Sequence, residues 1–362
     1  QAHVADESAL EPRVVLARLR LAEGNPRKAL DILGGGEGAI PNHPAALELA
    51  ARAHLALEQP DEAVELLSRW MEQSPEAAQA HLLLARAHVR AGNAEAAVRR
   101  LERVLELDPE DTRALSLLAR AKRREGANDE ARALIERLPE DTRGSAYVLR
   151  DRAILAQRAG ETEQAVALYR QLLEAEPAGS TAVGMARTLA REGARAEAVA
   201  VLEEWSENHP GDTSSLLALA EYYSAMDRGA DAIAAYRRVL DAEPDSVPGR
   251  NNLAWMLRHR APDEALAHAE RAVELQPDNP AVRDTLGMVL LARGEAEAAR
   301  QHLRRAVESA PDSPTLRYHL AQALAEAGRA DEARRQLEHA LDSDQAFSER
   351  DNARALLSEL DG

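Results

Sequence analysis

An alanine recurs along this chain at a nearly constant interval of 33 or 34 residues. The ten alanines are Ala29, Ala63, Ala97, Ala131, Ala165, Ala198, Ala232, Ala265, Ala299 and Ala333. A fixed period of this size predicts a stacked array of similar units. Each unit of such an array contacts only its neighbours. Function is therefore expected on a long surface, and no single buried pocket is implied.

Each interval also contains a pattern that predicts two helices joined by a turn. In residues 78–111 the eighth position is Ala85, the fifteenth is Gly92, the twentieth is Ala97 and the thirty-second is Pro109. Small side chains allow two helices to cross closely. Glycine accepts the left-handed conformation that follows a helix C-terminus. The residue before proline avoids the α region, so Pro109 predicts the end of the second helix.

This pattern resembles the tetratricopeptide repeat, a helix–turn–helix unit of 34 residues. Ten repeats begin near residues 10, 44, 78, 112, 146, 179, 213, 247, 280 and 314. The resemblance implies an all-α fold, a right-handed superhelical solenoid of about ten tetratricopeptide helix-turn-helix repeats. A C-terminal capping helix is expected near residues 349–360, where Ala353, Leu356, Leu357 and Leu360 would cover the last open face.

An early proline divides the expected array. Pro139 comes too soon in the fourth repeat, so its second helix is predicted to be short, and residues 139–144 are a candidate hinge. We therefore expect an N-terminal flank at 1–9, repeats 1–4 at 10–145, repeats 5–10 at 146–346, and the capping helix at 347–362.

Composition excludes several classes of function. The chain has no cysteine, which removes disulfides, thiolate zinc sites and thiol nucleophiles. Its net charge of −17 disfavours binding to nucleic acid or to anionic membranes. No metal-binding or nucleotide-binding motif occurs, and the repeats leave no room for a catalytic domain. We therefore expect a non-enzymatic protein with no cofactor and no bound metal.

A row of arginines occupies the inner surface that the resemblance implies. The first helix of each repeat would line a concave groove, with positions 9 and 13 on one helix face. Arginines at these positions are Arg18, Arg52, Arg86, Arg90, Arg120, Arg124, Arg158, Arg187 and Arg191, and Arg113, Arg123 and Arg150 add to them. Guanidinium groups bind carboxylates in a bidentate way, so we expect the groove to hold an acidic peptide or an acidic polysaccharide. In the alternative, these arginines pair with neighbours such as Glu48 and Glu125 and only solubilise the face.

The arginine row stops at the seventh repeat, and a different inner wall follows. Its candidate binding residues are Asn251, Trp255, Arg258, His259 and Tyr318. An exposed tryptophan on a concave wall is typical of an interface anchor. In the alternative, Trp255 packs against the next repeat.

The last third of the chain carries more specific motifs. They are Asn251-Asn252-Leu253-Ala254-Trp255, Asp284-Thr285-Leu286-Gly287 and Arg317-Tyr318-His319-Leu320-Ala321. Over residues 247–360 the chain resembles the PEP-CTERM system TPR-repeat lipoproteins. One departure is Met288, which stands where that family usually has a tryptophan after the glycine.

The resemblance implies a periplasmic scaffold that works with an exosortase and with exopolysaccharide synthesis or export. Its membrane tether would be an N-terminal lipid outside this fragment, since the chain starts at Gln1 without a methionine. Protein partners, or an acidic peptide or polysaccharide, would bind in the concave groove. The alternative is a cytoplasmic adaptor or chaperone-type module that captures an acidic peptide.

Overall fold

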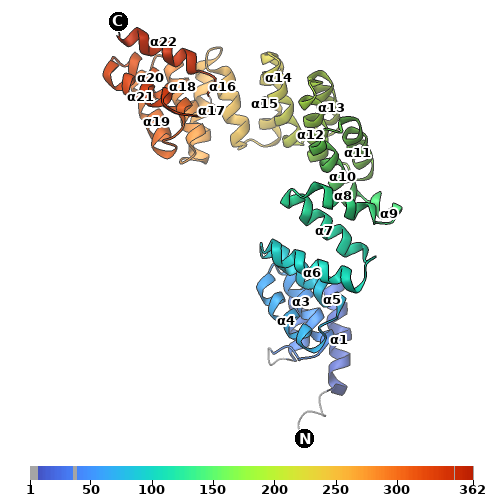
Figure 1. The fold of residues 1–362 in the computed structure, drawn as a ribbon. Helices are drawn as coiled ribbons and strands as arrows, with labels where there is room; N and C mark the ends of the chain where they lie inside the picture. Colours follow the sequence, from blue (N-terminus) through green and yellow to red (C-terminus); the bar gives the residue numbers. More distant parts are fainter. Residues whose placement is uncertain (1–6, 36–38, 346, 362) are drawn as a thin grey trace. The chain divides into compact units, whose positions relative to one another are not determined.

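The computed structural model describes residues 7–35, 39–345 and 347–361. Over these residues all 22 regular elements are α-helices and none is a strand, so the predicted all-α class is confirmed (Figure 1). The helices pack mainly against their sequence neighbours, as expected for repeats. Helix α1 begins at Glu7, while residues 1–6 of the expected N-terminal flank lie outside the described part.

The chain divides into two compact units, Gln1–Glu176 and Pro177–Gly362. The helices of the first unit are α1 (Glu7–Ala22), α2 (Pro26–Gly34), α3 (Pro44–Ala56), α4 (Pro60–Gln73), α5 (Ala78–Arg90), α6 (Ala94–Leu107), α7 (Thr112–Glu125), α8 (Asn128–Glu136), α9 (Glu140–Arg143), α10 (Ala146–Ala159) and α11 (Thr162–Ala175). The helices of the second unit are α12 (Gly179–Arg191), α13 (Arg195–Asn208), α14 (Thr213–Ala225), α15 (Gly229–Ala242), α16 (Val247–Leu257), α17 (Pro262–Leu275), α18 (Pro280–Ala292), α19 (Ala296–Ser309), α20 (Pro314–Glu326), α21 (Ala330–Leu341) and α22 (Arg350–Asp361).

The recurring alanines lie where the helices of a repeat meet. All ten alanines at position 20 have 0% of their surface exposed. Position 8 of each repeat is an equally buried alanine, except for Gly287 in the ninth repeat. A methyl group at these positions fills the contact without pushing the helices apart, which explains the period seen in the sequence.

The turns confirm the role of the glycine at position 15. All seven glycines predicted there adopt positive φ angles, for example 79° at Gly92. In the second and seventh repeats the same turn is made by Glu58 at 59° and Asp227 at 57°. The backbone geometry of the turn is therefore kept even where a side chain makes it unfavourable.

Two irregular regions follow the sequence expectations. Helix α8 has nine residues, compared with 14 in α6 and α11, so the short second helix before Pro139 is confirmed. The division between the two units falls one repeat later, at Glu176 and Pro177. At the other end α22 packs on α20 and α21, with Ala353 fully buried and Leu356, Leu357 and Leu360 half-buried.

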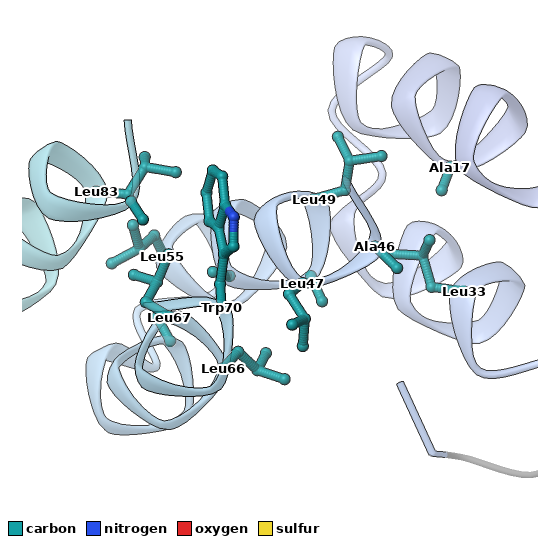
Figure 2. Close-up of a cluster of buried hydrophobic side chains, with 14 of the residues drawn as sticks. Ala17, Leu33, Ala46, Leu47, Leu49, Leu55, Leu66, Leu67, Trp70 and Leu83 are labelled. Atoms are coloured by element: carbon teal, nitrogen blue, oxygen red, sulfur yellow. The ribbon is translucent and has the colours of Figure 1, made fainter. Parts of the chain in front are cut away.

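The core of the first unit is built from leucines and alanines on successive helices. Leu47, Leu67 and Leu83 are essentially inaccessible to solvent, and Trp70 on α4 is 7% exposed among them (Figure 2). This packed layer fixes the spacing of α3 and α5 and so positions the side chains on their opposite faces.

Candidate functional site

The clearest candidate site is a groove of about 410 Å³ in the first unit. It is lined by residues of α3, α5, α7 and α10. Its lining includes Arg52, Arg86, Arg113, Arg120 and Tyr147. Leucines and Ser116 make up much of the remaining lining, and none of the described residues that line this groove is acidic. Four guanidinium groups thus face one space of the size of a ligand pocket.

Three of these four arginines have a carboxylate neighbour outside the groove. Arg52 lies 2.6 Å from Glu48, Arg113 lies 2.9 Å from Asp111, and Arg120 lies 3.3 Å from Asp151. Arg52 and Glu48 thus form the ion pair that the sequence suggested. An arginine has five N–H donors, so one such pair leaves donors for a second partner.

Arg86 is the exception, because it makes no ion pair with any described residue. The pKa of its guanidinium is lowered by burial and by the positive charges of Arg90, Arg52 and Arg113. The group stays protonated at neutral pH, so the lowered pKa reflects an uncompensated charge. An anion in the groove would remove this unfavourable interaction.

A buried aspartate that the sequence reasoning missed holds part of the groove in place. Asp151 on α10 is 5% exposed and lies 2.8 Å from Arg123 as well as 3.3 Å from Arg120. It occupies position 6, where the second, third and fourth repeats have Leu49, Leu83 and Leu117. The sequence feature that could have predicted this buried aspartate is the acidic residue itself, because three other repeats have leucine at the same position.

Two arginines at position 13 bind the backbone of the preceding repeat. Arg90 donates a hydrogen bond to the carbonyl of Leu55, and Arg158 donates one to the carbonyl of Arg123 at 2.6 Å. Each bond joins a residue to one that lies 35 positions earlier. These side chains connect adjacent repeats and are less available to a ligand than Arg86.

The remaining arginines of the predicted row are not gathered at this groove. Arg18 is exposed on α1, and Arg124 on α7 lines a neighbouring cavity. Arg187 and Arg191 lie on α12, in the second unit. The structure therefore brings together Arg52, Arg86 and Arg120 of the predicted row, with Arg113 beside them.

In the second unit Trp255 is in contact with aromatic and cationic side chains. The guanidinium of Arg258 lies 3.9 Å from the centre of the Trp255 ring, and its N–H donates to the Trp255 carbonyl at 2.6 Å. Burial lowers the pKa of Arg258. The ring of His319, two repeats further on, lies 6.0 Å away. Trp255 is half-buried, and these two contacts lie within its own repeat and with the tenth repeat.

Tyr318 and His259 differ in their exposure. Tyr318 is only 6% exposed, because it packs near Phe347 and its hydroxyl accepts a hydrogen bond from Gln322. His259 is exposed after the end of α16. Asn251 donates to the side chain of Asn252, while its own Oδ1 is buried without a hydrogen-bond partner among the described residues.

Two kinds of feature are absent from the part of the chain that the structure describes. Over residues 7–35, 39–345 and 347–361 no three histidine, aspartate or glutamate side chains are grouped closely enough to hold a metal ion. Within the same ranges no helix has the length and apolar character needed to cross a membrane.

Paired helices, buried alanines at fixed positions and glycine turns define a helical-repeat protein. Two family profiles, both described as Tetratricopeptide repeat, match the chain. One matches residues 20–87, 54–120, 88–153, 156–222, 256–313 and 290–360, and the other matches 217–280. The chain belongs to the tetratricopeptide repeat family, a family of protein-interaction scaffolds.

Among solved structures the similar chains share low identity with this one. MamA is 17% identical (TM-score 0.39) over 45% of this chain and 91% of its own. A thermophilic tetratricopeptide-repeat protein of Thermus thermophilus is 21% identical (0.42) over 51% and 98%. The Cut9–Hcn1 hetero-tetramer of the APC/C is 16% identical (0.43) over 96% and 76%. No curated protein matches the chain.

Proposed function

We propose that this chain is a scaffold of the bacterial envelope that works in exopolysaccharide synthesis or export, alongside an exosortase system. In this proposal the groove formed by Arg52, Arg86, Arg113 and Arg120 binds an acidic segment of a partner. The protein performs no chemistry itself, and it assembles other components by binding them.

The observation that carries the proposed binding is the charge of the groove. Four guanidinium groups face a space of about 410 Å³ without an acidic side chain in its described lining, although the whole chain has a net charge of −17. Arg86 is exposed, yet it lies among like charges, which is unfavourable in the free protein. Groups held in this way are more often found at functional sites than on ordinary surfaces.

The proposed setting depends on the sequence motifs of the last third. The motifs Asn251 to Trp255, Asp284 to Gly287 and Arg317 to Ala321 resemble those of the PEP-CTERM lipoproteins. A gene sequence upstream of Gln1 that encodes a signal peptide and a lipidated cysteine would support this setting. A cytosolic start with neither would contradict it and favour a cytoplasmic adaptor.

The binding proposal is tested with a double variant, Arg52→Gln with Arg86→Gln. These two residues are chosen because Arg120 and Arg123 hold the buried Asp151 and their removal would leave that charge unpaired. Fluorescent poly-glutamate and an acidic polysaccharide such as polygalacturonate serve as probes in anisotropy titrations. Two lost charge-assisted hydrogen bonds should weaken binding about tenfold or more.

The matched control is Arg99→Gln with Arg103→Gln. Both control residues lie on α6, do not line the groove, and give the same change in net charge. We expect this control to retain the affinity of the original protein. Binding should also weaken with added salt, because exposed ion pairs are screened. The proposed anion binding in the groove would be wrong if both double variants lost the same affinity. It would also be wrong if the unmodified protein bound neither probe.

A further inference from the structure

A second cavity of about 360 Å³ adjoins the arginine groove. Its walls include Val89 at the end of α5, Ala94 and Ala97 at the start of α6, and Ala121 on α7. Val89 is 43% exposed, although its side chain is fully apolar. We call this the valine cavity.

The valine cavity and the arginine groove share two lining residues, Leu117 and Arg120. Both residues lie on α7, so this helix borders both spaces. The guanidinium of Arg120 donates a hydrogen bond to the buried Asp151, which holds this side chain in place. A ligand that crosses α7 at Leu117 would therefore contact both spaces.

The two spaces differ in chemical character. The groove is lined by four arginines, whereas five of the nine residues that line the valine cavity are Val89, Leu117 and three alanines. The charged residues of the cavity are Arg120, Arg124 and Glu125. Arg124 makes no ion pair with the described residues. The cavity thus combines an apolar lining with two arginines and one glutamate, and it lies next to a strongly cationic groove.

We infer that the ligand of this site is an acidic peptide in which a bulky apolar residue lies next to the acidic stretch. The acidic side chains occupy the arginine groove, and the apolar side chain enters the valine cavity. This inference rests on the proposed anion binding and adds the class of ligand. An acidic polysaccharide lacks a bulky apolar side chain that could bury the exposed surface of Val89.

An array of ten-residue peptides tests the inference on the full chain. Every peptide carries four glutamates, and one further position carries leucine, phenylalanine or, as the control, serine. In the array, the variable residue is placed at every possible site relative to the four glutamates. The best peptides with leucine or phenylalanine should bind about tenfold more tightly than their serine counterparts, because they bury an apolar side chain. Polygalacturonate should bind more weakly than these peptides.

The variant Val89→Ser should reduce the ratio of the affinities for the leucine or phenylalanine peptides and the serine peptides from about tenfold to near one. Val89 is exposed, so the substitution is compatible with folding. Val15→Ser is the matched control, because Val15 is 66% exposed on α1 and lines neither space. The control variant should keep the preference.

The possible failures are distinguishable. If the leucine, phenylalanine and serine peptides bind with equal affinity, the inference is wrong. The proposed anion binding would still be supported if the double variant Arg52→Gln with Arg86→Gln bound all of these peptides more weakly. Tighter binding of polygalacturonate than of any peptide also overturns the inference. If no peptide and no polysaccharide binds, the proposed groove and the inference fail together.

Discussion

Arginine has different roles in the two units of this chain. In the first unit Arg52 and Arg86, at position 9 of their repeats, face a common groove. In the second unit Arg250, Arg283 and Arg317, at position 4, donate through Nε to the carbonyls of Pro244, Pro277 and Pro311 at 2.8, 2.5 and 2.8 Å. In the second unit the charge is thus paired with the backbone of the preceding repeat.

At these two positions the partner of the guanidinium differs, and so does its effect on stability. A guanidinium bonded to a proline carbonyl satisfies an acceptor at a helix end and stabilises the junction between repeats. A guanidinium crowded by like charges, as at Arg86, makes the free protein less stable and leaves the charge available for binding. The same residue type therefore stabilises repeat junctions at some positions, such as Arg90 and Arg250, and keeps its charge available for binding at others, such as Arg86.

The largest effect is expected for Gly287→Ala in the second unit. Every repeat of the first unit has alanine at position 8, but a Cβ at Gly287 would lie only 2.4 Å from Cγ of the buried Leu303. Overpacking of this kind should lower the free energy of unfolding of the second unit by about 3 kcal/mol. Urea denaturation measures this effect, with Gly211→Ala, where the added Cβ meets nothing within 4 Å, as the control. If the change costs nothing, position 8 is equivalent in both units.

A smaller loss is expected for the triple variant Arg250→Met, Arg283→Met and Arg317→Met. Methionine keeps the apolar stem and removes the donors to the three proline carbonyls. At a net value of roughly 0.7 kcal/mol per hydrogen bond, the second unit should lose about 2 kcal/mol of stability. Urea denaturation with hydrogen exchange would locate the loss. A loss confined to the first unit would contradict the assigned role.

Glycine at the two unusual turns should stabilise both units. Glu58→Gly relieves a left-handed residue in the first unit, and Asp227→Gly does so in the second. The expected gain is about 1 kcal/mol for Glu58→Gly and less for Asp227→Gly, because aspartate tolerates this conformation better than glutamate. Gly92→Ala is the reverse control and should destabilise. A loss of stability on Glu58→Gly would show that the glutamate side chain itself stabilises the turn.

The smallest effect is expected for Arg86→Gln. Removal of this exposed charge, which is surrounded by Arg90, Arg52 and Arg113, should raise the free energy of unfolding of the free first unit by no more than about 0.5 kcal/mol, because water screens exposed charges. The gain should shrink in high salt, because added ions screen the repulsion. Thermal denaturation at two salt concentrations measures it. A clear loss of stability would mean that Arg86 has a structural role like that of Arg90.

The sequence predicted the repeated backbone well, because each repeat has the same local chemistry. Ala97 is buried, Gly92 ends a helix, and α8 stops before Pro139, as their residue types and positions required. The sequence also placed Arg52, Arg86 and Arg120 on one surface, and all three line the same groove.

The partners of individual arginines were not predictable in the same way. Arg90 and Arg124 both occupy position 13, yet Arg90 bonds to Leu55 whereas Arg124 lines a cavity. The difference depends on the packing of the preceding repeat and on side-chain rotamers, which a periodic pattern does not encode. Asp151 was missed for a related reason, since its burial depends on two arginines of another helix.

The uniform alanines at position 20 have a consequence for how the chain finds its correct pairing. Ten helix contacts made by the same methyl group do not distinguish one neighbour from another, so a repeat could stack on the wrong partner during folding. Contacts that occur once can make that distinction. The buried pair of His319 and Asp284, with Nδ1 and Oδ1 2.8 Å apart, joins α20 only to α18. Such contacts favour the correct pairing of repeats, whereas the alanine contacts are the same in every repeat.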